Sequence, residues 1–318
     1  MRTIIVTGGA GFIGSHFIQL LKKTEKETRI VNLDALTYAG SIEQVPTWIR
    51  EDQSYHFVQG DIRDRGMLAE LFAAWEPDAV VNFAAESHVD RSIRRASLFL
   101  ETNLLGAGHL MDAARDVWQG NQEVRFVQIS TDEVYGPVEA GRKVNESAPL
   151  LPGNPYAASK AAADLLALSY FNTYGFPVII TRCTNNYGPG QHGEKLIPTV
   201  LRHLKEGRGI PLYGDGLQVR DWIHVEDHCV AILAALQFGK PGSVYNIAGN
   251  QERTNLSMVQ TIAVLMGLEE PRITWTPDRP GHDRRYGVDD ARIRRELGWN
   301  PRISLEDGLR DLVLAQEF

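Results

Sequence analysis

Hydrophobic positions in the first 183 residues alternate between two periods. Short runs rich in β-branched residues, such as TIIVTG (3–8), predict buried strands, and longer runs with apolar residues at helical spacing, such as FIGSHFIQLLKKT (12–24), predict helices. The strands predicted in this way span 3–8, 29–34, 56–61, 79–85, 125–130 and 177–183, and the helices span 12–24, 64–75, 97–118 and 156–175. Strands that alternate with helices predict an α/β fold with a doubly wound parallel sheet of the Rossmann type.

The pattern is less regular after residue 183, and we expect a second, smaller α/β domain there. The segments predict a loop over 185–198, a helix over 198–207, a strand and helix over 223–239, a strand over 243–249 and short helices near 257–267 and 304–315. No linker separates them from the first half. The larger domain is therefore expected to contain 1–184 and about 212–249, and the interleaved substrate domain about 185–211 and 250–318.

The composition disfavours several classes of protein. The 318 residues include 33 Lys and Arg against 40 Asp and Glu, a net charge of −7, so no basic excess is available for binding nucleic acid. Only Cys183 and Cys229 are cysteines, which favours a reducing compartment. With no readable signal peptide and no apolar run long enough to span a bilayer, we expect a cytoplasmic protein without membrane contacts. No cluster has the spacing of metal ligands, so we predict no metal.

A glycine-rich turn between the first strand and the first helix predicts a cofactor site. Gly8, Gly11 and Gly14 lie in TGGAGFIG, where the backbone can approach a pyrophosphate at the positive end of the helix. Asp34 ends the second strand and can accept hydrogen bonds from a ribose diol. Because a carboxylate there repels a 2′-phosphate, the glycine turn and Asp34 together favour NAD over NADP. Asp61, at the end of the third strand, is a candidate for the adenine end or an ordinary turn residue.

Tyr156 and Lys160 form the first part of a predicted catalytic set. They stand four residues apart in a predicted helix and so share one face of it. An ammonium group near a phenol lowers the pKa of the phenol, and such a tyrosine can remove the proton of a sugar hydroxyl while NAD takes the hydride.

Adjacent carboxyl groups form the second part. The strand 125–130 runs into Thr131, Asp132 and Glu133, which therefore lie at the carboxyl end of a parallel strand, where such sheets bind ligands. A simple oxidoreductase needs only a hydroxyl there. Two carboxyl groups in different environments can serve as an acid and a base.

These motifs make the chain resemble the extended short-chain dehydrogenases/reductases, through TGGAGFIG, Asp34 and YAASK. Within that group it is similar to the dTDP-glucose 4,6-dehydratase family over nearly its whole length, through DALTYAG (34–40), AAESHVDRSI (84–93), STDEVYG (130–136), NNYGP (185–189), EKLIP (194–198), RDWIHVEDH (220–228) and DRPGHDRRY (278–286). The TDE triplet separates this family from related sugar epimerases, which usually carry Ser or Thr there without the acid pair.

The resemblance implies binding roles that the spacing alone does not assign. For NAD it implies Gly8, Gly11, Phe12, Ile13, Gly14, Asp34, Ala35, Leu36, Thr37, Asp61, Ile62, Ala84, Ala85, Thr102, Tyr156, Lys160 and Asn186. For the hexose it implies Ser87, Thr131 and Asn185, and for the nucleotide diphosphate end Lys195, Leu196, Pro211, Tyr213, Arg220, Asn255, Arg279 and His282.

The expected reaction converts a nucleotide-linked hexose to its 4-keto-6-deoxy form. Tyr156 would take the C4 hydroxyl proton, Glu133 the C5 proton, and Asp132 would protonate the departing C6 oxygen, with NAD regenerated. A sugar-nucleotide 4-epimerase and a non-catalytic NAD-sensing protein are the alternatives, and the base and the hexose stay open. The resemblance also implies a homodimer in which helices 97–118 and 156–175 pack against their copies.

Overall fold

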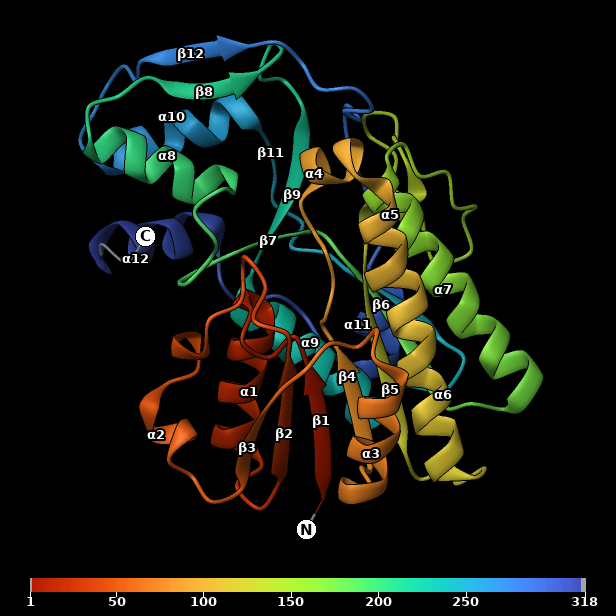
Figure 1. The fold of residues 1–318 in the computed structure, drawn as a ribbon. Helices are drawn as coiled ribbons and strands as arrows, with labels where there is room; N and C mark the ends of the chain where they lie inside the picture. Colours follow the sequence, from red (N-terminus) through yellow and green to blue (C-terminus); the bar gives the residue numbers. More distant parts are fainter. Residues whose placement is uncertain (1, 316–318) are drawn as a thin grey trace.

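Seven parallel strands form the central sheet of the structure, a computed structural model that describes residues 2–315 (Figure 1). Their order is β10-β6-β5-β4-β1-β2-β3, so consecutive strands are added outward on one side from β1 and on the other side from β4, while β1 and β4 themselves are parallel neighbours. This order confirms the doubly wound α/β prediction. The strands are β1 (Thr3–Thr7), β2 (Arg29–Asp34), β3 (Tyr55–Gln59), β4 (Ala79–Asn82), β5 (Arg125–Thr131), β6 (Val178–Cys183) and β10 (Val244–Ile247).

Helices cover both faces of this sheet because alternate strand residues point to opposite sides. Ile4 and Val6 pack with α1 (Phe12–Thr24) and α9 (Val225–Phe238), whereas Ile5 packs with α3 (Arg65–Trp75), α6 (Ala107–Trp118) and α7 (Pro155–Tyr174), as the two buried clusters show. In Figure 1, α1 lies on one side of the sheet and α3 and α6 lie on the other. Both faces are therefore apolar, as the continuous hydrophobic strand segments predict.

Strand ends differ from the predictions where the site begins. β3 ends at Gln59 and β4 at Asn82, so the segments 60–62 and 83–87 are loops at the carboxyl edge of the sheet, where main-chain groups face the cleft. After β4 the apolar residues Phe83, Ala84 and Ala85 continue past the end of the strand, which explains why that predicted strand was too long.

The long helix predicted over 97–118 is interrupted. It consists of α5 (Ala96–Phe99), a π-helical segment η2 (Leu100–Gly106) and α6. In η2 the side chain of Asn103 turns inward: its Nδ2 donates to the Glu86 carbonyl at 2.9 Å and its Oδ1 accepts from the Glu86 N–H at 2.8 Å. A π-helical segment inside an α-helix often marks a functional site, and here it fixes the loop after β4.

A smaller lobe lies above the central sheet in Figure 1. It contains two small sheets, β11-β9-β7 and β12-β8, and a separate buried cluster. The bounds of its elements are β7 (Asn185–Tyr187), β8 (Ile210–Tyr213), β9 (Val219–His224), β11 (Glu252–Thr254), β12 (Ile273–Thr276), α8 (Leu196–Lys205), α10 (Asn255–Leu265) and α12 (Leu305–Ala315).

Two segments differ from the predictions for the second half of the chain. The predicted loop 185–198 contains β7 and the start of α8. The end of β8 and all of β9 pair within the small sheets, although they lie in the range 212–249 that was predicted for the larger domain. The remaining short elements are η1 (Ile42–Gln44), α2 (Thr47–Arg50), α4 (Val89–Arg94), η3 (Asp132–Tyr135) and α11 (Ala291–Leu297). Among residues 2–315, no helix has the length and apolarity to cross a membrane.

Candidate active site

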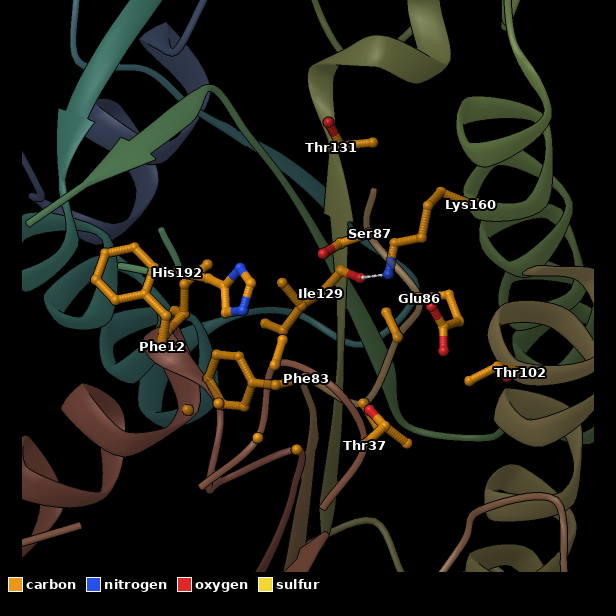
Figure 2. A pocket seen from close by; sticks show the side chains of 18 of the residues that line it. Phe12, Thr37, Phe83, Glu86, Ser87, Thr102, Ile129, Thr131, Lys160 and His192 are labelled. Carbon is orange, nitrogen blue, oxygen red and sulfur yellow. Dashed lines mark hydrogen bonds between the residues drawn. The ribbon is translucent and has the colours of Figure 1, made fainter. Parts of the chain in front are cut away.

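A cavity of about 340 Å³ opens at the carboxyl ends of the central strands (Figure 2). All five predicted catalytic residues line it, and so do the predicted NAD residues except Leu36. Of the predicted substrate residues, Ser87, Thr131, Asn185 and Lys195 line it, and the others lie outside its wall: Leu196, Pro211, Tyr213, Arg220, Asn255, Arg279 and His282.

The glycine turn is packed too closely to the neighbouring backbone for a side chain to fit at Gly8 or Gly14. Gly8 has a φ of +67°, and a Cβ there would lie 2.7 Å from the Ala84 nitrogen. A Cβ on Gly14 would lie 2.3 Å from the Gly8 carbonyl oxygen. Gly11 is the N-cap of α1, and no side chain of the described residues caps this helix end. The first-turn N–H groups of α1 therefore suit a pyrophosphate.

Asp34 fits the ribose end of a dinucleotide. Its Oδ2 accepts from the Ala10 N–H at 2.9 Å and its Oδ1 from the Leu36 N–H at 2.8 Å, so both oxygens are aimed by the backbone. Burial raises the pKa of this carboxyl, while the two N–H donors oppose the rise. Each oxygen keeps a further lone pair for a hydroxyl donor. Together with the glycine turn, this donor and acceptor set fits NAD.

Tyr156 and Lys160 lie on α7, whose start is locally encoded. Asn154 caps the helix by accepting from the Ala157 N–H, and Pro155 occupies its first turn. Lys160 is 4% exposed and donates through Nζ to the Ile129 carbonyl at 2.5 Å, a contact visible in Figure 2. The strand end of β5 thus anchors the lysine.

The pKa of Tyr156 is raised in this structure, whereas the sequence predicts a pKa lowered by Lys160. Burial raises the pKa of Tyr156 well above its usual value, and the charges of Glu133, Cys183 and Asp132 raise it further, opposed by a hydrogen bond with Thr131. Burial also lowers the pKa of Lys160. A buried phenol near carboxylates stays protonated unless a cation lies close to it.

Asp132 and Glu133 occupy different environments although they are adjacent. Asp132 is 2% exposed, and burial followed by the charge of Glu133 raises its pKa to about 8. Thr131 Oγ1 donates to its Oδ1 at 3.2 Å, and its Oδ2 has no hydrogen-bond partner among the described residues. Asp132 is therefore a protonated acid at neutral pH, with an oxygen available to hold a transferable proton.

Glu133 contacts two side chains that Asp132 does not. Its Oε2 lies 3.2 Å from Asn154 Nδ2 and 3.3 Å from the Tyr286 hydroxyl, which also contacts Asp283 Oδ2 at 2.9 Å. The two neighbouring carboxyl groups therefore differ in burial and in hydrogen-bond partners, which is the condition for one to serve as an acid and the other as a base.

Several residues of the site were missed at the level of sequence. Asn154 supports Glu133 only because the start of α7 meets η3. Cys183 lines the cavity, and burial raises the pKa of its thiol to about 12. Glu86, Gln191 and His192 also line the cavity, from loops that carry no periodic signal. The one available signal was for Tyr286, which ends the quoted motif DRPGHDRRY.

A buried ion pair supports the turn of residues 130–135, which carries Thr131, Asp132 and Glu133. Arg182 Nε donates to Asp164 Oδ2 at 2.8 Å, and Ser130 Oγ donates to the same oxygen at 3.0 Å. Arg182 Nη1 also donates to the Tyr135 hydroxyl at 2.8 Å. Both ends of the 130–135 segment are thus fixed. Breaking a buried pair of this kind typically costs about 3–5 kcal/mol.

No group of three metal-ligating side chains occurs within residues 2–315. Some of the predicted substrate residues that do not line the cavity make ring contacts near the smaller lobe. The guanidinium of Arg220 lies 4.4 Å from the Tyr286 ring centroid, and the rings of Tyr213 and His282 are 6.3 Å apart. Leu196 and Asn255 begin α8 and α10, and Pro211 lies in β8.

Comparison with known proteins agrees with this geometry. The family model described as GDP-mannose 4,6 dehydratase matches residues 5–312. The dTDP-glucose 4,6-dehydratase of Xanthomonas campestris pv. campestris (strain B100) is 46% identical over 323 residues, covering 97% of this chain and 91% of that protein.

Solved structures distinguish two groups. A dTDP-glucose 4,6-dehydratase from Streptomyces venezuelae with NAD and TYD bound is 46% identical, with a TM-score of 0.93 over 98% of this chain and 96% of that one. A Thermus thermophilus UDP-glucose 4-epimerase in complex with NAD has a TM-score of 0.88 but only 30% identity, over 97% of each chain. The fold is shared by both groups, whereas the sequence lies nearer to the dehydratases. The chain therefore belongs to the sugar-nucleotide dehydratase family that the GDP-mannose 4,6 dehydratase model describes, together with its dTDP-glucose 4,6-dehydratase relatives.

Proposed function

We propose that this protein is an NAD-dependent 4,6-dehydratase (a hydro-lyase) of a nucleotide-linked hexose, with dTDP-glucose as its substrate. The observation that carries the proposal is the contrast between Asp132, a buried acid, and Glu133, whose carboxyl group contacts Asn154 and Tyr286. An epimerase has no use for this pair, because it removes and returns a hydride at one carbon only. A non-catalytic NAD sensor would need neither the pair nor Tyr156.

The proposed mechanism divides the proton transfers among three residues. The glycine turn and Asp34 would hold NAD, which would supply the acceptor for the C4 hydride and the donor of the hydride that C6 receives. Tyr156 removes the C4 hydroxyl proton as the ketone forms, helped by the positive charge of Lys160 on the same helix and by the hydrogen bond with Thr131. The ketone acidifies C5–H, Glu133 takes that proton, and Asp132 protonates the C6 oxygen so that water leaves. C5 is reprotonated at the end.

A panel of nucleotide-linked hexoses tests the proposal. Purified protein with dTDP-glucose should give a 4-keto-6-deoxy product that has lost one water in mass and absorbs as a ketone in alkali, with no net change in NAD. A product of unchanged mass would indicate epimerisation. Turnover of another nucleotide-glucose in preference would correct the substrate and keep the chemistry.

Replacing Asp34 with alanine should weaken NAD binding by about 10-fold or more, because hydrogen bonds to a charged group are worth about 1.5–3 kcal/mol. Discrimination against NADP should also shrink, since the repelling carboxylate is gone. Fluorescence titration with both cofactors measures this, with Glu123→Ala, an exposed carboxylate in the loop before β5, as control. Equal affinity of the wild type for NADP and NAD would contradict the assignment.

The raised pKa of Asp132 predicts a pH dependence. Asp132 must carry a proton to act as the acid, so turnover should fall about 10-fold per pH unit above the pKa of about 8. Asp132→Asn should be slow and lack this alkaline limb. A substrate with fluoride on C6, which needs no proton to leave, should restore much of the variant's rate. An alkaline limb that persists in Asp132→Asn would assign it to another group.

We also propose that the protein is a homodimer. Leu100 and Leu105 of η2 and Leu165 of α7 are 43%, 53% and 58% exposed, and they lie on the two long helical segments for which self-association is expected. Sedimentation velocity over a range of protein concentrations tests it, and a mass of one chain at all concentrations would reject it.

A further inference from the structure

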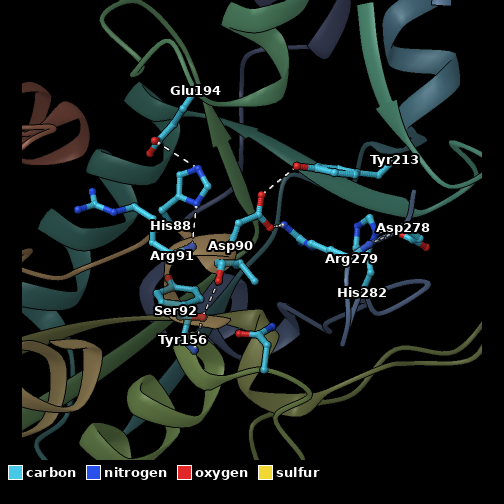
Figure 3. Close-up of polar contacts among 12 residues, drawn as sticks. His88, Asp90, Arg91, Ser92, Tyr156, Glu194, Tyr213, Asp278, Arg279 and His282 are labelled. Atoms are coloured by element: carbon cyan, nitrogen blue, oxygen red, sulfur yellow. Dashed lines mark hydrogen bonds and ion pairs between the residues drawn. The ribbon is translucent and has the colours of Figure 1, made fainter. Parts of the chain in front are cut away.

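The short helix α4 lies where the two lobes meet, and its side chains contact three separate segments (Figure 3). His88, which caps it, places Nε2 at 3.3 Å from Glu194 Oε2. Ser92 Oγ accepts from the Tyr156 N–H at 3.2 Å. Asp90, between them, points to the smaller lobe. The helix therefore connects the catalytic tyrosine with three later segments of the chain, which contain Glu194, Tyr213 and Arg279.

Asp90 uses both carboxylate oxygens to hold residues of the smaller lobe. The Tyr213 hydroxyl donates to Oδ2 at 3.0 Å, and Arg279 Nη1 lies 3.3 Å from Oδ1. Tyr213 ends β8, whereas Arg279 lies in the loop after β12. One carboxylate thus sets the separation of two side chains that the sequence assigns to the nucleotide diphosphate end.

The pairing of Arg279 is incomplete. Its Nε is buried and has no hydrogen-bond partner among the described residues, although Nη1 is paired with Asp90. A buried donor without an acceptor is unfavourable, and an arginine edge is well suited to an anionic oxygen. The geometry therefore leaves Arg279 with a donor for an anion while Asp90 holds another part of its guanidinium.

Asp90 also acts on a second cation near Arg279. Burial lowers the pKa of Lys195 and Arg279 adds to the fall, whereas the charges of Glu194, Glu133 and Asp90 oppose it. A carboxylate near two cations reduces the repulsion between them, which a diphosphate site requires.

We propose that Asp90 is a positioning residue for the nucleotide diphosphate of the substrate: it holds Arg279 and Tyr213 of the smaller lobe against α4, so that Arg279 presents Nε to a phosphate oxygen. The inference rests on the proposed function.

Substitution of Asp90 tests the proposal through binding and kinetics. Asp90→Asn can accept only one of the two donors, so dTDP affinity, measured by calorimetry, should fall about 10-fold. KM for the nucleotide-sugar should rise by a similar factor with kcat within about 2-fold, the pattern of lost uniform binding. NAD affinity should not change. Asp90→Glu should recover part of the loss, and Asp116→Asn, an exposed carboxylate on α6, should behave as wild type.

A double-mutant cycle separates positioning from general charge effects. In an Arg279→Gln background, Asp90→Asn should lower dTDP affinity by less than it does in the wild type, because part of its effect passes through the contact with Arg279. Additive losses would overturn the proposal, as would unchanged or tighter dTDP binding by Asp90→Asn, or an equal loss of NAD affinity. If the wild type binds dTDP and Asp90→Asn binds it equally, this inference alone fails. If the wild type binds none of the nucleoside diphosphates tested, the proposed function fails with it.

Discussion

Replacing Glu133 with glutamine should lower dehydratase turnover by about 10²–10⁴-fold, the usual contribution of a general base. An amide cannot take the C5 proton, yet it can keep the contact with the Tyr286 hydroxyl, so the fold of the turn should survive. C4 oxidation does not involve Glu133 in the proposed mechanism. NADH absorbance should therefore appear on mixing with substrate and persist, because the hydride has no acceptor at C6.

The control for this variant is Glu139→Gln, which alters an exposed carboxylate paired only with Arg142 in the loop after the catalytic turn. It should show wild-type turnover and no lasting NADH signal. Full dehydratase activity in Glu133→Gln would remove this residue from the role of base. Loss of both turnover and NADH formation would place it in the oxidation step.

Replacing Tyr156 with phenylalanine should stop the reaction one step earlier. Without the hydroxyl, the C4 proton has no acceptor, and turnover should fall by about 10²–10⁴-fold with no NADH signal at any time. Burial and nearby carboxylates raise the pKa of this phenol, so a cation is needed beside it for proton transfer. Lys160→Met should therefore show the same early block.

Stopped-flow absorbance at the NADH maximum separates the two variants. Tyr174→Phe, on the same helix but exposed, is the matched control and should be indistinguishable from the wild type. NADH formation at the normal rate in Tyr156→Phe would show that another group accepts the C4 proton. Together, the two substitutions order the steps: oxidation requires Tyr156, and elimination requires Glu133.

The sequence accounts for most of the central sheet because its signals are local. Ile4 and Val6 pack on one face of the sheet and Ile5 on the other, as the strand period requires, and α7 begins at Pro155, one residue before the predicted start of the helix. The adjacency of Asp132 and Glu133 and their place after a parallel strand are also local properties. The same signals do not mark the π-helical segment η2, whose residue Asn103 contacts Glu86 in a loop outside the helix.

The different roles of two neighbouring carboxyl groups were decided by tertiary structure. Burial and the charge of Glu133 raise the pKa of Asp132 to about 8. Glu133, in contrast, contacts Asn154 at the start of α7 and Tyr286 in a loop 153 residues further along the chain. The direction of the Tyr156 pKa shift was misjudged for the same reason: spacing along a helix shows which residues are close, but not how much water surrounds them. Sequence alone determined the sheet, the cofactor turn and the residue types of the site, since each depends on neighbours along the chain. Charge states and the contacts of Asp90 depend on which distant segments exclude water from a group or donate to it, and only the folded chain brings those segments together.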